Sequence, residues 1–406
     1  MKQSTSAGEV SPRKAGLTKP DPGRRPHRKI RVGSPASLLP IVPHLLGFVP
    51  DSSLVVIGAA AAHGQINVTL RYDLPDPPDP SIAGDIAEHA AGVLTAQGVA
   101  TMIAIGYGPA RLVDPLAEAL RALSPRTGFT LLDILRVQDE RYSSYLCAKA
   151  GCCPPEGIAF DAATSTVSAQ TASPGTGSPG TGSPGTGSSG TGSGAIGLAV
   201  TGSPVLGARS ELAATVAAVG GPAGESMRRA TRLAEDRADK LIARIARTGK
   251  RGEGRRLISL AGVQAVTEAI AIYRGGGRLD SDDRVAWLTV VLRDLRVRDD
   301  AWARMVPEHR EAHLKMWTDI VPRARPGHVA AAASLCAFVA WQCGNGALAN
   351  IALDRALADQ PRYSMAHLLR QVIGSGAPPE GARLPMTPEE VAASYDDLEG
   401  PDADEP

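Results

Sequence analysis

A five-residue repeat of small and polar residues divides this chain of 406 residues into two parts. Residues 173–192 read SPGTG three times and then SSGTG, without one large apolar side chain. Such a stretch can bury nothing, so it predicts a flexible low-complexity loop or linker over residues 171–207. The regions on either side must supply their own hydrophobic cores, and each is long enough to do so. We therefore expect domains over residues 30–170 and 208–376.

The region before the repeat is predicted to be an α/β domain with a mixed sheet. Ser34 followed by Pro35 is typical of a helix start, and Gly47 ends that short helix. The expected strands are 54–57, 66–72, 99–105, 131–137 and 141–146, and the expected longer helices are 82–97 and 109–123. The first two strands form an antiparallel hairpin within an α/β pattern, which makes the sheet mixed.

Beyond residue 208 the apolar spacing becomes helical almost to the end, so we predict an all-α region. The expected helices are 212–219, 226–247, 255–273, 284–295, 301–305, 308–320, 327–343, 347–359 and 364–373. In the last helices, Gly344, Ala349, Leu353, Ala356 and Pro361 follow the spacing of the second half of a tetratricopeptide repeat. The region is thus predicted to end in a tetratricopeptide-like helical hairpin, with a generic helical hairpin as the alternative.

The charge of the chain is balanced overall but polarised at its ends. Lys and Arg total 43 against 42 Asp and Glu, which gives no overall field favouring nucleic acid or an anionic membrane. Residues 1–29 form a basic tail that we expect to be disordered, and residues 377–406 form an acidic tail that we expect to be solvated. Nucleic acid is therefore not an expected partner, except through weak contact with the basic N-terminal tail.

The sequence predicts a cytoplasmic protein that does not enter a membrane. Residues 1–29 lack an apolar stretch after their basic residues, unlike a secretory signal. The longest apolar run, 38–57, contains three prolines, a histidine and an aspartate, which a spanning helix would not tolerate. Five cysteines, an odd number, do not make a disulfide framework in a chain of this length.

Three of these cysteines, Cys147, Cys152 and Cys153, lie within seven residues and are followed by Pro154 and Pro155. A structural zinc site usually has two pairs of ligands, whereas the spacing here is C-x4-C-C with no second pair. We favour a stiff turn whose thiols are buried as small hydrophobic groups, with a redox-active pair and a metal site as alternatives. No cofactor is expected, and zinc is the ion expected if the cysteines bind a metal.

A second candidate site is the run LRDLRVRDDAWARM, in which Arg293, Arg296 and Arg298 alternate with aspartates. The pattern favours an ion-paired helix junction, and the alternative is an arginine cluster that binds an anionic ligand. Further on, His309 and His313 lie four residues apart, but the glutamate between them is one position away from its place in the zinc motif HExxH. We therefore expect these histidines to lie on a packed helix face.

Five longer sequence segments resemble those of a known protein family. They are SPASLLPIVPHLLGFVPDSSLVVIG, RYSSYLCAKAGCCPPEG, LTVVLRDLRVRDDAWARM, HLKMWTDIVPRA and CAFVAWQCGNGALANIALDRALADQPRYSMAHLLRQ. With them the chain resembles the actinobacterial family called domain of unknown function 4192, over about residues 30–170 and 208–376. The glycine-serine repeat departs from the family as an expansion in a variable loop. The resemblance implies no activity, cofactor or catalytic residue.

These observations predict a non-enzymatic protein-interaction or regulatory module, whose protein partner the sequence does not identify. The alternative is an enzyme or an anionic-ligand-binding protein with a site between the α/β domain and the helical region, near the cysteine loop. A cleft that joins the cysteines to Arg293 or Arg298 would favour this alternative.

Overall fold

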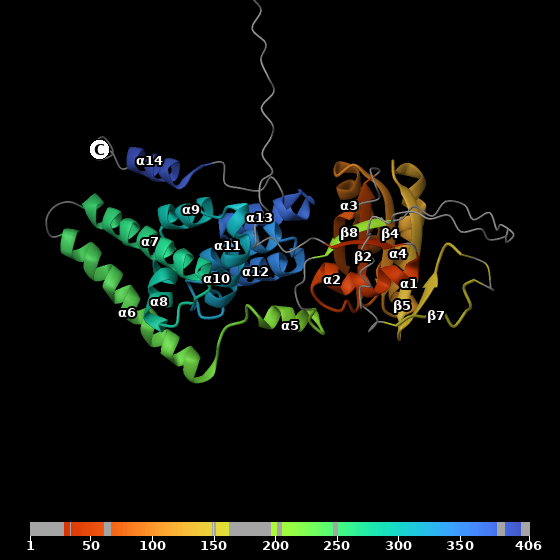
Figure 1. Cartoon of the computed structure of the whole chain (residues 1–406), viewed down its shortest axis with the longest axis horizontal. Helices are drawn as coiled ribbons and strands as arrows, with labels where there is room; N and C mark the ends of the chain where they lie inside the picture. Colours follow the sequence, from red (N-terminus) through yellow and green to blue (C-terminus); the bar gives the residue numbers. More distant parts are fainter. Residues whose placement is uncertain are drawn as a thin grey trace, which may run out of the picture.

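A computed structural model describes residues 28–32, 34–60, 66–147, 149, 152–161, 196–200, 205–246, 251–379 and 386–398. A mixed sheet with helices forms the N-terminal part, and a mostly helical region follows it (Figure 1). The predicted disorder of residues 1–27 and the glycine-serine repeat lie outside the described residues. The fold class is confirmed at this level, with an α/β part followed by helices.

The main sheet has six strands in the order β3-β2-β4-β5-β6-β7. Their bounds are β2 Ser53–Ala60, β3 Ile66–Asp73, β4 Val99–Tyr107, β5 Thr130–Gln138, β6 Arg141–Ser144 and β7 Ile158–Ala159. Only the β4–β5 pair is parallel; the other neighbours in this sheet pair antiparallel. The sheet is therefore mixed, as predicted, and the predicted hairpin is the β2–β3 pair.

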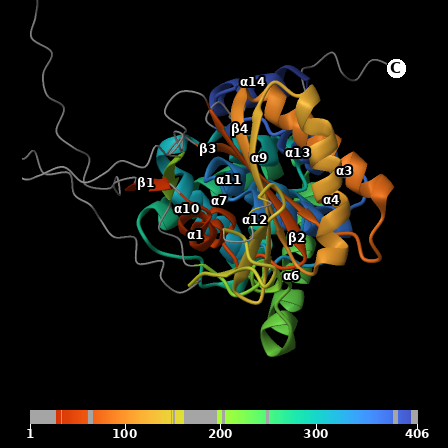
Figure 2. The same ribbon diagram turned by 90° about the vertical axis from the view of Figure 1, so that its right-hand side faces the viewer.

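Each face of the sheet carries its own hydrophobic core. The helices α3 (Pro80–Ala96) and α4 (Ala110–Leu123) cover one face and pack on alternate strand residues such as Leu54, Val56 and Ile134 (Figure 2). Strand residues of opposite parity face the second core, which extends from the sheet into the helical region. Because side chains alternate across a strand, one buried strand can serve both cores.

The short helical segment before β2 lies on the second face. It consists of α1 (Pro35–Leu38), the 3₁₀ turn η1 (Leu39–Ile41) and α2 (Val42–Leu46). Ser34 caps α1, Pro35 occupies its first turn, and Gly47 ends α2 in the left-handed conformation at φ +83°. The predicted helix start and end are confirmed, although the prolines break the segment into three short pieces.

A small second sheet was not predicted. Strand β1 (Arg28–Val32) pairs antiparallel with β8 (Ile196–Val200), which lies within the stretch expected to be a loop or linker. The residues IGLAV alternate too briefly to indicate a strand by themselves. Strand β1 starts at Arg28, so the expected disorder of the tail was wrong for Arg28 and Lys29.

The helical region packs around the buried helix α11 (Ala330–Gln342), whose residues are all buried. The other helices are α5 (Arg209–Ala214), α6 (Gly221–Ala246), α7 (Arg251–Arg274), α8 (Asp282–Val291), α9 (Leu295–Ala303), α10 (Arg310–Ile320), α12 (Gly346–Asp359), α13 (Ser364–Gly374) and α14 (Pro388–Leu398). His313 on α10 is 2% exposed, which confirms the packed face predicted for it, whereas His309 is half-buried and lies just before α10 begins.

The two parts of the chain share one hydrophobic core rather than meeting through a linker alone. Phe48, 1% exposed, forms a parallel backbone bridge with Leu206 at the entrance to the helical region. On the opposite side, a Cβ atom added to Gly376 would lie 2.2 Å from a methyl carbon of Val93 on α3. The α/β part and the turn that follows α13 are therefore in direct contact.

Two helix expectations near the chain's charged runs were wrong. The expected helices 284–295 and 301–305 are instead α8, which ends at Val291, and α9, which starts after Asp294 because that side chain accepts hydrogen bonds from the Arg296 and Val297 amides. The acidic tail is not solvated throughout, since it contains α14, which packs on α9.

Candidate functional site

The cysteine loop connects the last two strands of the main sheet. Residues 145–157 leave β6 and return to β7, whose Ile158 pairs with Tyr142. Arg141 closes the base of the loop, because its guanidinium donates to the carbonyls of Glu156 and Gly157, each at 2.7 Å. Gly157 is required there, since its φ is +75° and a Cβ atom would lie 2.9 Å from the Tyr142 carbonyl oxygen. Both ends of the loop are therefore fixed to the sheet.

Backbone turns bring the three cysteines together. Ser144 Oγ accepts a hydrogen bond from the Cys147 amide at 3.0 Å and donates to Asp133 Oδ1 on the neighbouring strand β5 at 2.6 Å. The Lys149 carbonyl accepts from the amides of Cys152 and Cys153, at 2.9 and 2.8 Å. The loop thus folds back on Cys147 by means of its own backbone.

The thiols of Cys147, Cys152 and Cys153 form a cluster at the surface, which we call the thiol cluster. All three Sγ atoms lie within 4.8 Å of one another. Cys152 is exposed, and Cys147 and Cys153 are half-buried. The expectation of a stiff turn with buried thiols was therefore wrong. Strand β7 is an edge strand of the sheet, so the β6–β7 connection lies at that edge.

Hydrogen bonds within the thiol cluster make its members chemically unequal. A hydrogen bond from the Lys149 backbone, together with one from the Cys153 side chain, lowers the pKa of Cys147. Hydrogen bonding to Cys147, together with partial burial, raises the pKa of Cys153 to about 11. One sulfur is thus prepared to carry negative charge while its neighbour holds its proton.

The candidate arginines lie on a different part of the molecule. Arg296, with a side chain 7% exposed, forms an ion pair of 2.7 Å with Asp396 on α14. Arg298 pairs with Asp299 at 2.6 Å, whereas Arg293 lies exposed between α8 and α9. Figure 1 shows α9 in the helical region, well away from β7 in the α/β part. The structure therefore brings the cysteines together but does not bring the arginines to them.

The contact between α14 and α9 is a site that sequence reasoning missed. Val391 on α14 is 1% exposed, and Tyr395 Oη donates to Asp299 Oδ2 at 2.7 Å. A signal for this helix was present: Thr387 and Glu390 form reciprocal hydrogen bonds of 2.7 and 3.2 Å, the capping box expected from T-x-x-E, with Pro388 at the first helical position.

The groove beneath α14 is formed by α7 and α9. Its apolar and charged lining residues are Leu260, Val263, Arg296, Asp300, Arg304 and, on α14 itself, Pro388, Glu389, Val391 and Ala392. We call the α7 and α9 side of this contact the basic groove. Arg256 on α7 adds a weaker contact of 4.0 Å to Asp396. The groove thus combines apolar side chains with guanidinium groups opposite an acidic helix.

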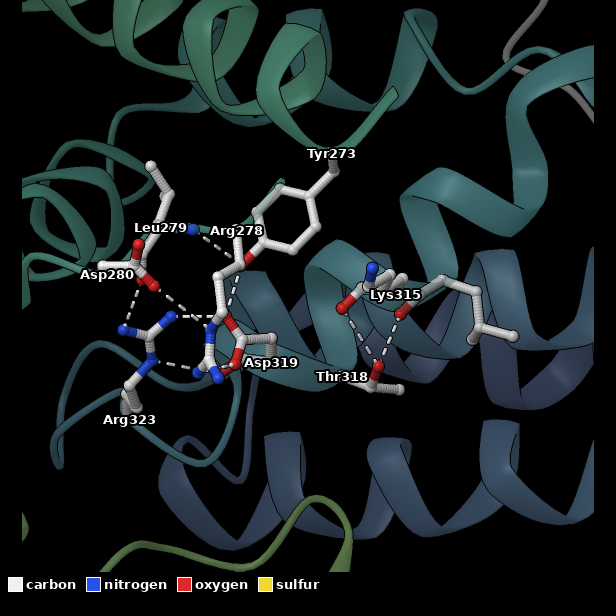
Figure 3. Close-up of polar contacts among 9 residues, drawn as sticks. Tyr273, Arg278, Leu279, Asp280, Lys315, Thr318, Asp319 and Arg323 are labelled. Atoms are coloured by element: carbon white, nitrogen blue, oxygen red, sulfur yellow. Dashed lines mark hydrogen bonds and ion pairs between the residues drawn. The ribbon is translucent and has the colours of Figure 1, made fainter. Parts of the chain in front are cut away.

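A third polar cluster joins the loop after α7 to α10 (Figure 3). Asp319 accepts hydrogen bonds from Tyr273 Oη and Arg323, and from Arg278 at 2.7 Å. Arg323 also donates to the Leu279 carbonyl at 2.8 Å. Burial and the hydrogen bond to Asp319 raise the pKa of Tyr273 to about 12. Each charged group here has a partner, so the cluster holds helices together and leaves no free ligand group.

One helix within the described residues is long and apolar enough to cross a membrane, judged by length and composition alone. It is the Gly254–Arg274 portion of α7, and 39% of its apolar window is buried in the chain. Core helices of helical bundles pass the same test, and α7 packs against α6, α8, α9 and α10.

The described residues define a mixed α/β protein with a helical region, a surface thiol cluster and an acidic helix on a basic groove. A profile of the family described as domain of unknown function (DUF4192) matches residues 35–380, which is most of the chain. The chain belongs to this family, as the resemblance predicted. No curated protein and no solved structure matches the chain significantly.

Proposed function

We propose that this protein is a non-enzymatic protein-interaction or regulatory module that binds an acidic amphipathic helix of a partner in the basic groove. The observation that carries the proposal is that the chain already places such a helix there, since α14 docks through Val391 and through the Arg296–Asp396 pair. A helix laid in a groove is a recurring mode of peptide recognition.

The groove suits an acidic partner for electrostatic reasons. Arg256 and Arg296 both contact Asp396 of α14, whereas Arg304 is paired with Asp300 in the groove and lies near Glu389. Complementary charge of this kind speeds association and selects among partners. Because Asp396 is 43% exposed in this pair, salt should weaken the contact and make α14 replaceable.

Exposed apolar side chains next to the groove extend the surface available to a longer helix. Leu257 and Leu260 on α7 are 46% and 47% exposed, and Leu295 at the start of α9 is 53% exposed. A partner helix longer than α14 would cover them, which gives it an advantage over α14 in hydrophobic burial.

The α11–α12 pair is the tetratricopeptide-like hairpin of this proposal and provides a second element suited to protein contacts. Support comes from Ala349, Leu353 and Ala356, which are fully buried at the repeat positions, and from Gly344 with φ +76° in the connecting turn. We place the module in the cytoplasm, away from membranes, with only weak nucleic acid contact through its basic N-terminal tail.

The test is competition for the groove. A fluorescent peptide of residues 386–398 is titrated into the full chain and into its Val391→Asp variant, in which an unfavourable buried charge displaces α14. The peptide should bind the variant at least ~10-fold more tightly than the wild type, because its site is free there. Binding should weaken as salt is raised.

Matched controls separate docking from unfolding. Ala393→Asp adds the same charge on the exposed face of α14 and should leave peptide binding as in the wild type. A peptide that itself carries Asp in place of Val391 should not bind either chain. If the Val391→Asp chain retains its far-ultraviolet spectrum and yet binds no peptide, the groove is not a docking site.

A further inference from the structure

We propose that Cys147, Cys152 and Cys153 bind one thiophilic metal ion, Zn²⁺ in the first place, through three thiolates with the fourth coordination position open. This inference is independent of the basic groove, which lies in the other part of the chain. The spacing C-x4-C-C did not favour a metal site, so this assignment goes beyond the sequence prediction.

The separation of the sulfurs fits one ion. Zinc–sulfur bonds of about 2.3 Å in tetrahedral geometry place the sulfurs roughly 3.8 Å apart. The three Sγ atoms of the thiol cluster already lie within 4.8 Å of one another. A contraction of about 1 Å or less between sulfurs completes the site, which side-chain rotation can supply.

The loop is preorganised for this geometry by contacts that do not involve sulfur. Arg141 and the β6–β7 pairing fix its two ends, and the Lys149 carbonyl holds the amides of Cys152 and Cys153. A site whose ligands are held before binding loses less conformational entropy when the ion arrives. The adjacent cysteines thus present their sulfurs on the same side as Cys147.

Asp133 and Ser144 are positioning residues for this site. Asp133 Oδ1 accepts from Ser144 Oγ at 2.6 Å, and Ser144 Oγ accepts from the Cys147 amide at 3.0 Å. The chain of hydrogen bonds connects strand β5 to the first metal ligand. Outer contacts of this kind typically contribute about 10- to 100-fold to metal affinity.

The chemistry balances without an oxidant. Three thiols and one M²⁺ ion give a trithiolate complex of charge −1 and release three protons to solvent. Soft sulfur ligands select Zn²⁺, Cd²⁺ or Cu⁺ over Mg²⁺ and Ca²⁺. The open fourth position is taken by water or by an exchangeable ligand, because Cys152 is exposed at the surface.

The test uses the full chain, reduced and freed of metal with a chelator. Co²⁺ is titrated first, because its thiolate charge-transfer absorption reports sulfur ligands directly, and Zn²⁺ is then added to displace it. We expect one Co²⁺ per chain, loss of the absorption on Zn²⁺ addition, and no response to Mg²⁺. Each of the Cys→Ser variants at 147, 152 and 153 should lower the charge-transfer intensity by about a third and weaken binding at least ~10-fold.

Two controls make the result specific. Cys343→Ser removes a half-buried thiol of the helical region and should leave Co²⁺ binding unchanged. Asp133→Asn should weaken binding while leaving the charge-transfer intensity at saturation unchanged, since the number of thiolates stays three. Wild-type affinity in this variant would overturn the positioning role of Asp133, and a loss of charge-transfer intensity would mean that a thiolate no longer binds the ion.

The proposal is overturned if the wild type shows no charge-transfer absorption, or if the triple Cys→Ser variant binds Co²⁺ as tightly as the wild type. It is also overturned if the metal-free chain in air loses two free thiols to a disulfide among Cys147, Cys152 and Cys153 and the reduced chain has no affinity for Zn²⁺. That outcome would assign a redox-active pair instead.

Discussion

The thiol cluster differs from the cluster of Tyr273, Arg278, Asp319 and Arg323, which we call the Asp319 cluster, in how many of its hydrogen-bonding groups have partners. Asp319 takes hydrogen bonds from Tyr273, Arg278 and Arg323, and the guanidinium of Arg323 has a second acceptor in the Leu279 carbonyl. Among the described residues, the sulfurs of the thiol cluster have few partners beyond one another and a single backbone amide; Cys152 is exposed, and Cys147 and Cys153 are half-buried.

This difference separates polar clusters that hold the fold from those that can accept a ligand. A saturated cluster contributes to stability and strongly resists the loss of any member, because the remaining buried charges would have no partner. An exposed cluster without strong partners contributes little to stability and keeps its binding capacity for something else. Substitutions in the two clusters should therefore have opposite signatures in stability and binding.

The largest expected effect is that of Asp319→Ala. It leaves Arg323, with a side chain 11% exposed, without its carboxylate and Tyr273 without an acceptor. Urea denaturation should show a loss of about 3 kcal/mol in the free energy of unfolding. Asp280→Ala, which removes an 86%-exposed carboxylate near Arg278, should cost less than about 0.5 kcal/mol. Equal effects of the two substitutions would contradict the importance of saturation.

A second large effect should come from acid, through His313. Burial, together with the nearby charges of His309 and Arg274, lowers the pKa of His313 to about 4. The unfolded chain has a His pKa near 6.5, so the unfolded state binds the proton first and stability falls as the pH drops from about 6.5 to about 4.

Protonation should lower the free energy of unfolding by about 3 kcal/mol in all, and this loss is complete below pH 4. Urea denaturation at pH 7, 5.5 and 4 measures it. His313→Gln should remove this part of the pH dependence, whereas His367→Gln, which changes an exposed histidine, should retain it. A wild type whose stability is flat between pH 6.5 and 4 would show that His313 does not resist protonation.

A moderate effect is expected for a buried cysteine outside the thiol cluster. Cys336 on α11 is fully buried, and burial raises its pKa to about 12. Cys336→Ala should lower the free energy of unfolding by about 1–2 kcal/mol through lost packing. In the native chain the Cys336 thiol should react with a disulfide reagent only as fast as the chain opens.

The smallest effect on stability is expected for Cys152→Ala in metal-free protein. The side chain is exposed, so its loss removes little packing and the urea midpoint should stay at the wild-type value. The native wild type should nevertheless show rapid reaction of the loop thiols and slow reaction of Cys336. A large loss of stability on Cys152→Ala would restore the buried-turn interpretation that the exposure of Cys152 contradicts.

The elements of the α/β part were predictable because their signals are local. Ser34, Pro35 and Gly47 mark one helical segment, and the alternation from Ile66 to Tyr72 marks a strand whose partner lies just before it. The short strand β7 was not predicted, because two residues carry no period and are held by pairing with β6. The helix α14 was missed because its acidic composition outweighed the capping box at Thr387 and Glu390.

For the candidate sites too, the residues were predictable from local sequence, whereas their surroundings were not. Sequence reasoning found all three cysteines but assigned them to the interior, because neighbouring prolines and thiols are also typical of a packed turn. It grouped Arg293, Arg296 and Arg298 by their spacing, yet each meets a different environment once Asp294 starts α9. The family was identifiable from five sequence segments alone, and the match over residues 35–380 confirms it.

The sequence by itself determined the succession of an α/β part and a helical region, the mixed sheet and the family, because periodicity and capping act over a few residues. The tertiary structure alone decided which charges are neutralised and which sulfurs meet. Arg296 and Asp396 are 100 residues apart, and Asp133 holds the cysteine loop from a neighbouring strand. Such pairs depend on how elements pack, and no local pattern in the chain specifies the partner across that separation.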